Sequence, residues 1–321
     1  MSQTEPVGTS VEAATDPATG LEVLRIGDGT VTVTVVPAVG AKITSFTSVR
    51  TGAEYVWQDP VRPVVLVPEG AGYGDADASG VDDCFPTVDP CLYPAEQFPG
   101  VTAGDHGDLW PIPWSWSQRP GALDLQVTAP NLPYRLTRTL SFDAPGSLLL
   151  DYRLESLSDL PLPYQWTAHP LLRCEPGLRI GLVPGQECRP VFAAGDRITA
   201  TERWSWPLAP GPGGPVDMSV APSHESQVNE KFWTRMPEGG CWLGYPSTRE
   251  RLTITSALEW LALCVDYGGW PEVSPGYWVA PEASTSCWDS LSDSVARGTH
   301  RVLAPRGTDT WWWRLALTTD Y

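Results

Sequence analysis

The stretch LLLDYRL at residues 148–154 decides the fold class, because large apolar and polar side chains alternate along most of it. Positions 148, 150, 152 and 154 are Leu or Tyr, whereas Asp151 and Arg153 would face the other way. A period of two is what burial of one face of an antiparallel sheet produces. Residues 134–142 repeat the pattern, with Arg138 as the exception on the apolar face. Both stretches therefore predict strands of a sheet with one buried face.

Short runs of strand-forming residues, separated by Gly and Pro, continue on both sides of this stretch. The first two are joined by Gly27-Asp28-Gly29, a typical hairpin connection. Strands are expected at residues 21–26, 31–36, 41–49, 53–57, 241–244, 252–255, 260–265, 277–280 and 311–317. Helices are expected only at 225–232 and 288–295, and no repeat of 20 to 50 residues is present. We predict an all-β protein: a flexible segment at 1–18, then one large antiparallel β-sandwich domain over 19–321.

The composition agrees with a β fold and excludes some partners. The 321 residues include 33 Pro and 30 Gly, both unfavourable inside helices, and 16 Trp. The net charge of −17 repels nucleic acid and anionic membranes, so neither is expected as a partner. The positive charge is almost entirely Arg, and Lys42 and Lys231 are the only lysines.

The cysteines and the N-terminal residues bear on the cellular compartment. Seven Cys form an odd number and include no CxxC pair, which fits neither a disulfide framework nor a zinc ribbon. Residues 1–20 are polar and acidic, without the apolar core of a signal peptide, and no apolar run is long enough to cross a membrane. We expect a soluble cytoplasmic protein that uses no metal and no organic cofactor.

Two stretches, 68–107 and 207–222, are too irregular to be strands. The first is acidic and rich in Gly and aromatic residues, and loops of this length are often functional. We therefore expect long loops over one face of the sandwich.

Two of the four histidines have surroundings that suit a site. His224 and His300 lie in polar or turn sequences and are expected on the surface. His106, in GDHGDLW (104–110), could donate a hydrogen bond to a sugar hydroxyl or could simply hold its loop. His169 ends the run YQWTAH (164–169) before Pro170, so its imidazole would lie where a strand opens onto a surface, unless it is a structural histidine.

One carboxylate stands out by its position. Glu282 ends the apolar run YWVAPE (277–282), before a small polar loop. Partial burial there would raise the pKa of Glu282 toward the range that a general base needs. A purely structural role for this residue is equally compatible with the sequence.

Taken in order, these segments resemble the galactose mutarotase-like superfamily, especially its aldose 1-epimerase-related branches. The resemblance spans about residues 21 to 317. It is carried by VGAKITSF (39–46), GVDDCFPTV (80–88), His106-Gly107, TAH (167–169), GGWP (268–271) and Pro281-Glu282.

The resemblance implies roles for specific residues. Glu282 would remove the proton from the anomeric hydroxyl, His169 would protonate the ring oxygen, and His106 would help to hold the sugar. The two catalytic groups would reset each other through the sugar, so no cofactor is implied. Further sugar contacts are implied by position at Asp83, Trp110, Asp266 and Trp270.

The sequence departs from the family at two points that concern the substrate. The better-known mutarotases carry Arg and Asn before their first His, where this chain has Val81-Asp82-Asp83-Cys84. The aromatic residues that follow the second His in the family are replaced here by Pro170-Leu171-Leu172. The sugar and the oligomeric state therefore stay open. The main hypothesis is an isomerase that interconverts the α and β anomers of a neutral aldose. The alternatives are a non-catalytic carbohydrate-binding or sugar-sensing protein, and an epimerase or lyase acting at a carbon.

Overall fold

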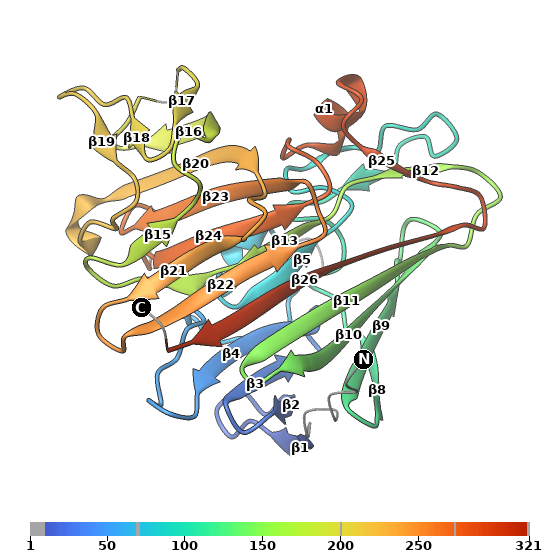
Figure 1. Cartoon of the computed structure of the whole chain (residues 1–321). Helices are drawn as coiled ribbons and strands as arrows, with labels where there is room; N and C mark the ends of the chain where they lie inside the picture. Colours follow the sequence, from blue (N-terminus) through green and yellow to red (C-terminus); the bar gives the residue numbers. More distant parts are fainter. Residues whose placement is uncertain (1–9, 69–70, 200, 273, 320–321) are drawn as a thin grey trace, which may run out of the picture.

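Two large antiparallel sheets pack face to face in the protein (Figure 1). The computed structural model describes residues 10–68, 71–199, 201–272 and 274–319. The strands of the larger sheet are, in spatial order, β1 (Ser10–Thr15), β2 (Glu22–Gly27), β3 (Val31–Val36), β4 (Lys42–Ser48), β5 (Val81–Cys84), β13 (Thr167–Pro170), β24 (Tyr277–Ser284), β23 (Trp260–Tyr267), β20 (Val228–Arg235), β16 (Glu187–Ala194), β17 (Trp204–Ser205), β18 (Leu208–Ala209) and β19 (Val216–Asp217), with β14 (Leu172–Arg173) paired to β24.

The smaller sheet and the remaining elements complete the fold. The smaller sheet contains, in spatial order, β15 (Arg179–Gly181), β21 (Cys241–Tyr245), β22 (Glu250–Ser256), β26 (Thr308–Thr318), β11 (Ser147–Ser156), β10 (Tyr134–Ala144), β9 (Ala122–Thr128) and β8 (Ser115–Arg119). Two short pairs lie outside the sheets: β6 (Cys91–Leu92) with β7 (Thr102–Ala103), and β12 (Leu162–Tyr164) with β25 (Arg301–Leu303). The helix α1 spans Leu291–Ala296. None of the helices described has the length and apolar character needed to cross a membrane.

The hydrophobic core lies between the two sheets, and the alternating strands supply it. In β11, Leu148, Leu150, Tyr152 and Leu154 are buried, whereas Asp151 and Arg153 are exposed. The neighbouring strand β26 alternates in the same way. The predicted all-β antiparallel sandwich is therefore confirmed, and the period-two patterns of β11 and β26 correspond to strands with one buried face.

The polar exception in β10 also points into the core. Arg138 is fully buried, and its Nη1 lies 2.8 Å from Oδ2 of Asp83 on β5 of the other sheet. Tyr152 Oη and Trp166 Nε1 donate to Oδ1 of Asp83 at 2.8 and 3.1 Å. A charge in a protein interior needs a partner of opposite sign and hydrogen bonds. Arg138 keeps the strand pattern and joins the two sheets through this ion pair.

Some predictions at the N-terminal part of the chain were wrong. The segment 1–18 was expected to be flexible, but Ser10–Thr15 forms β1 and pairs along its length with β2; residues 1–9 lie outside the described residues. Residues 53–57 form no strand, and only isolated bridges tie Glu54 to Thr47 and Val56 to Leu172. Residues 10–15 therefore form a strand because they pair with β2 at the edge of the sheet, although their sequence shows only a weak strand pattern.

The helix expected at 225–232 is also wrong. A short 3-10 turn at His224–Ser226 is followed by β20, which lies between β16 and β23. Pairing on both sides outweighs the local sequence preference here. The helix expected at 288–295 is confirmed in its second half as α1.

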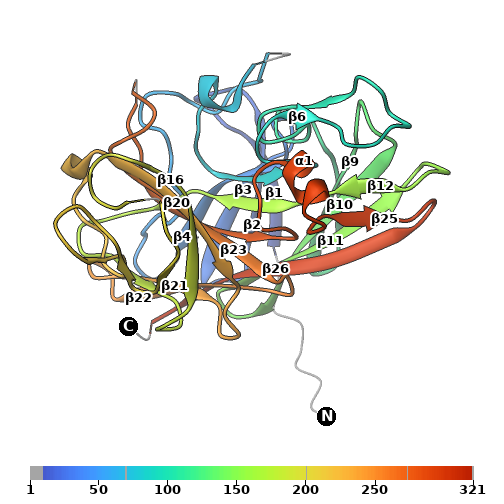
Figure 2. The same ribbon diagram turned by 90° about the horizontal axis from the view of Figure 1, so that it is seen from above.

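The expectation that residues 68–107 and 207–222 contain no strands was wrong in part. Val81–Cys84 forms β5 within the larger sheet, and the second stretch contributes β18 and β19. Residues of the first stretch on either side of β5 lie over the outer face of the larger sheet, as expected. Residues 73–107 run from a 3-10 turn at Tyr73–Asp75 through β5, β6 and β7. In Figures 1 and 2 this segment, drawn in blue to cyan, lies next to α1. The Ser292 hydroxyl of α1 donates to the Leu92 carbonyl of β6 at 2.9 Å. Loop and helix together enclose one end of the larger sheet.

Candidate functional site

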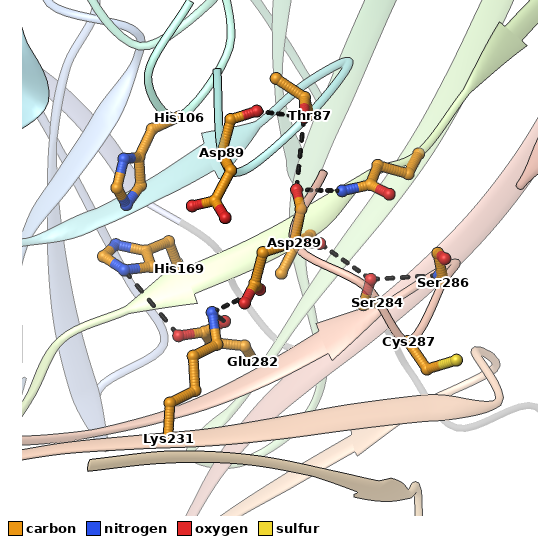
Figure 3. A network of polar contacts seen from close by, with 12 residues as sticks. Thr87, Asp89, His106, His169, Lys231, Glu282, Ser284, Ser286, Cys287 and Asp289 are labelled. Carbon is orange, nitrogen blue, oxygen red and sulfur yellow. Dashed lines mark hydrogen bonds and ion pairs between the residues drawn. The ribbon is translucent and has the colours of Figure 1, made fainter. Parts of the chain in front are cut away.

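A cleft of about 200 Å³ opens on the outer face of the central strands of the larger sheet. Strands β13, β24 and β20 form its floor, and the loop over residues 73–106 forms one wall. Its lining residues are Tyr73, Val88, Asp89, His106, His169, Val191, Phe192, Asn229, Lys231, Cys264, Trp270, Trp278, Glu282 and Asp289. Figure 3 shows the polar side chains converging from separate elements.

Glu282 lies at the floor of the cleft. Strand β24 places it opposite Ala262 of β23, on the sheet face that points away from the sandwich core. The side chain has 0% exposed surface, and among the described residues neither carboxylate oxygen accepts a hydrogen bond. Oε2 lies in an ion pair with Lys231, whereas Oε1 is free. Burial raises the pKa of Glu282, partly opposed by the nearby Lys231 ammonium. The free carboxylate oxygen is therefore a proton acceptor of increased basicity.

Lys231 on β20 occupies the other carboxylate oxygen. Its Nζ lies 2.9 Å from Oε2 of Glu282 and 2.8 Å from Oδ1 of Asp289. Burial alone would lower the pKa of Lys231, but Asp289 and Glu282 outweigh it and raise that pKa well above its ordinary value. The lysine stays charged between the two acids. It therefore fixes Glu282 so that only Oε1 is free to react.

His169 faces this free oxygen. Strand β13 ends at Pro170, and Nε2 of His169 lies 3.9 Å from Oε1 of Glu282 (Figure 3). Burial, followed by the charges of His106, Lys231 and Lys42, lowers the pKa of His169 well below its ordinary value. The predicted acid and base thus lie together at one end of the cleft.

His106 joins them from the covering loop. Its backbone has a φ of 58°, in the left-handed region, and its ring stacks on Tyr73 with centroids 3.9 Å apart. Nδ1 of His106 lies 2.8 Å from Oδ1 of Asp105. The next residue, Gly107, must lack a side chain, because a Cβ there would lie 2.0 Å from the Phe85 carbonyl oxygen. The loop held in this way places the ring centroid of His106 at 4.7 Å from that of His169.

The other lysine of the chain lies behind His169. The Tyr73 hydroxyl is 3.2 Å from Nδ1 of His169 and 3.1 Å from Oδ2 of Asp82. Lys42 Nζ is 3.3 Å from that same oxygen and 2.8 Å from Oδ2 of Asp77. All of these side chains are buried. His169 is therefore backed by a continuous polar network, whereas its Nε2 faces the cleft.

Aromatic rings provide the other walls. Trp270, Trp278 and Phe192 line the cleft, with Trp270 half-buried and Phe192 exposed. Trp270, which was expected as a sugar contact, is one of the residues that line the cleft. Flat apolar rings beside hydrogen-bonding groups suit a ligand with one apolar face and polar edges.

Three other expected residues do not line the cleft. Asp83 is turned to the core and paired with Arg138, so we assign it a structural role in place of the expected sugar contact. Trp110 is buried and donates its Nε1 to the Asp105 carbonyl, and Asp266 accepts the backbone N–H groups of Gly268 and Gly269. Burial raises the pKa of Asp266 to about 7. Trp110 and Asp266 hold the loops that carry His106 and Trp270.

Sequence reasoning missed several residues that the structure brings to the site. They are Tyr73, Asp82, Asp89, Phe192, Asn229, Lys231, Cys264, Trp278 and Asp289. The rarity of lysine was a usable signal, because both lysines of this chain are buried beside the predicted catalytic pair. In the described ranges, no group of three or more His, Cys, Asp or Glu side chains is arranged to hold a metal ion.

Comparison with known proteins gives structural relatives at low sequence identity. No family model and no curated protein matches the chain. A proposed aldose 1-epimerase from Klebsiella pneumoniae is similar with a TM-score of 0.67 and 16% identity, over 96% of this chain and 83% of that one. A proposed aldose 1-epimerase from Escherichia coli K12 gives 0.63 and 14%, over 97% and 99%.

A galactose mutarotase-like protein from Lactobacillus casei gives a TM-score of 0.61 at 14% identity, covering 96% of this chain and 100% of that one. The similarity therefore extends over nearly the whole length of both proteins. At this level of identity it establishes the architecture. The chain has the galactose mutarotase-like fold.

Proposed function

We propose that this protein is an isomerase of the aldose 1-epimerase type, which interconverts the α and β anomers of a neutral aldose. The observation that carries the proposal is the pairing of Glu282 and His169, whose free atoms Oε1 and Nε2 lie 3.9 Å apart at the cleft floor. The anomeric hydroxyl and the ring oxygen of a pyranose are both bonded to C1. An acceptor and a donor this close together can therefore serve one sugar.

The reaction needs only proton transfers and one bond cleavage. The cycle starts with Glu282 as a carboxylate and His169 as an imidazolium, protonated on both nitrogens. Oε1 of Glu282 takes the proton of the O1 hydroxyl, the C1–O5 bond breaks, and O5 receives the Nε2 proton of His169, which becomes neutral. The open-chain aldehyde then rotates about C1–C2, and ring closure on the other face returns both protons. Each cycle restores both side chains, so no further reactant is consumed.

The electrostatics of the pair support this exchange. Burial raises the pKa of Glu282 and lowers the pKa of His169 well below its ordinary value. A carboxylate with a raised pKa takes a proton more readily, and an imidazolium with a lowered pKa gives one up more readily. Since Glu282 has no exposed surface, the side chains that line the cleft must move apart for a sugar to reach Oε1.

The charges of the cleft favour an uncharged substrate. Asp89 is exposed at the cleft, Asp289 and Glu282 lie deeper, and the positive charge of Lys231 is taken up by two carboxylates. A phosphate or carboxylate on the sugar would meet like charges here. Neutral hexoses and pentoses are therefore the proposed substrate class.

Anomer exchange measured by NMR and polarimetry tests the proposal. The expected result is exchange between α and β forms of at least one neutral aldose that is faster than in buffer, with no deuterium entering a C–H position. Deuterium at carbon would indicate the epimerase or lyase alternative. Absence of exchange with every aldose tried would overturn the proposal.

A non-catalytic sugar-binding protein is the second candidate. The complete burial of Glu282 and its ion pair with Lys231 favour this alternative, because both restrict the carboxylate. This candidate predicts sugar binding by calorimetry without any acceleration of anomer exchange.

Trp270→Ala is expected to weaken sugar binding more than catalysis. Trp270 lines the cleft without touching the proposed acid and base, so its loss should raise KM about fivefold to tenfold, or ~1–1.4 kcal/mol, and leave kcat nearly unchanged. Steady-state kinetics on the best aldose measure this. Trp312→Ala, a half-buried tryptophan of the smaller sheet, is the matched control and should change neither constant. A fall in kcat at unaltered KM for Trp270→Ala would contradict a binding role.

A further inference from the structure

The hydrogen bonds in the buried network behind His169 run in a defined direction. Its members are Lys42, Asp82 and Tyr73, which we call the Lys42–Asp82–Tyr73 relay. Strand β5 pairs with β13, so that Asp82 lies directly opposite His169 in the sheet. The Tyr73 hydroxyl bridges Oδ2 of Asp82 at 3.1 Å and Nδ1 of His169 at 3.2 Å.

The direction of the hydrogen bonds follows from the charges. Lys42 can only donate, so the oxygen of Asp82 that it faces at 3.3 Å is stabilised as a carboxylate. An ionised Asp82 can only accept, and Tyr73 must therefore donate its single proton to it. The hydroxyl oxygen of Tyr73 is then left to accept a hydrogen bond from a protonated Nδ1 of His169.

We propose that the Lys42–Asp82–Tyr73 relay fixes the tautomer of His169 with the proton on Nδ1, so that Nε2 is the nitrogen that exchanges a proton with the sugar. This inference rests on the proposed function for the role of Nε2, whereas the tautomer itself is a property of the free protein. Asp82 and Tyr73 are positioning residues, since neither touches the reacting atoms. The logic is that of a buried carboxylate that orients a catalytic histidine.

The relay also predicts a dependence on pH. Burial raises the pKa of Asp82 to about 6, with Lys42 opposing the shift and Asp77 adding to it. Above this pH, Asp82 accepts from Tyr73; below it, a protonated Asp82 donates to Tyr73, which then donates to Nδ1. The other charged or titratable groups facing His169 are His106, Glu282 and Lys231. The proton of a neutral His169 should therefore move from Nδ1 to Nε2 as the pH falls through about 6.

Nitrogen-15 NMR of the imidazoles in the sugar-free protein tests the relay directly. We expect His169 to carry its proton on Nδ1 at pH 8 in the wild type. In Asp82→Asn, the new amide donates to Tyr73 and reverses the bonds, so the proton should appear on Nε2. Lys42 keeps Asp77 as a partner at 2.8 Å, which preserves the local fold. In Tyr73→Phe, which keeps the ring against His106, the preference for Nδ1 should be lost.

Kinetics and a control complete the test. With an aldose that the wild type turns over, Asp82→Asn should lower kcat by about 10²-fold with KM nearly unchanged. In this variant Tyr73 donates to Nδ1, so His169 no longer holds protons on both nitrogens, which is the form that protonates O5. Tyr134→Phe removes another buried hydroxyl, one without a hydrogen-bond partner among the described residues and outside the cleft. This control should alter neither the tautomer nor kcat.

Two outcomes separate the relay from the proposed function. A wild-type His169 with its proton on Nε2 at pH 8, or an unchanged Nδ1 proton in both Asp82→Asn and Tyr73→Phe, would overturn the relay even in an active enzyme. A relay that behaves as expected in a protein without anomer exchange would leave the inference standing and remove the proposed function.

Discussion

Replacing Glu282 by Gln should lower kcat for anomer exchange by about 10³-fold or more. Gln keeps the size of the side chain but cannot take the proton of the O1 hydroxyl, and a positioned general base contributes about 10²–10⁴-fold. Burial raises the pKa of Glu282, so its loss removes a base stronger than an ordinary carboxylate. Exchange NMR with the best neutral aldose measures the effect.

His169→Asn should cause a loss of similar size, and the double variant should be hardly worse than either single one, because the two groups act in one proton exchange. Glu230→Gln is the matched control: Glu230 lies on the same sheet as Glu282, is buried and is ion-paired with Arg197 from the loop after β16, but does not line the cleft. This control should keep wild-type kcat. Full activity in Glu282→Gln or His169→Asn would remove the catalytic assignment.

Lys231→Met is expected to lower the free energy of unfolding by about 3–5 kcal/mol, the usual cost of removing one partner from a buried ion pair. The variant leaves Glu282 and Asp289 buried without their shared positive charge. Urea unfolding at pH 7 measures this as a shift of the midpoint at unchanged slope. Combining Lys231→Met with Glu282→Gln and Asp289→Asn should recover part of the loss, because no unpaired charge then remains.

The pH dependence of this loss has a definite sign. Without Lys231, the pKa of Glu282 in the folded protein rises further above its value in the unfolded chain. A carboxyl group with a raised folded pKa stabilises the native state at a pH below its unfolded pKa. This contribution is lost as the pH rises through the folded pKa. The deficit of Lys231→Met should therefore be smaller at pH 4 than at pH 7. Arg235→Met, which removes an exposed ion pair from the same strand, should cost less than about 1 kcal/mol. Equal costs for both variants would show that the buried network is not stabilising.

The strands of the core were predictable because burial of one face leaves a period-two pattern. This holds for β11 and for β10, where Arg138 is buried in phase with the apolar residues. Its charge looked exceptional in the sequence because its partner, Asp83, lies far away along the chain. The pattern fails at β1, an edge strand without buried positions. It also fails at β20, where polar residues in the middle of the strand, Glu230 and Lys231, are buried by ion pairs and not by apolar packing.

The site could be predicted in part, for a similar reason. The resemblance to a known family picked out Glu282, His169 and His106, and the structure brings all three to one cleft. It also suggested Asp83, but neighbouring residues of a strand point to opposite faces. Asp82 therefore backs the cleft and Asp83 enters the core. Only the pairing of β5 with β13, which no local pattern reveals, decides which of the two acids faces His169.

Lys231 shows a second limit of sequence reasoning. The expected helix at 225–232 hid the alternation of β20, and Asp289 lies almost 60 positions away in the loop before α1. The ion pair that holds Glu282 arises only when these segments meet in three dimensions. The partners of a buried charge of this kind depend on which segments meet in the folded protein. In the sequence, only the scarcity of lysine indicated that Lys231 has a special role.

A structure of the protein with a bound neutral aldose tests the central claim most directly. We expect one pyranose in the cleft, with O1 within hydrogen-bond distance of Oε1 of Glu282, O5 within that distance of Nε2 of His169, and the ring against Trp270. A sugar bound with C1 turned away from both side chains, or bound elsewhere on the protein while Glu282 stays enclosed, would contradict the account.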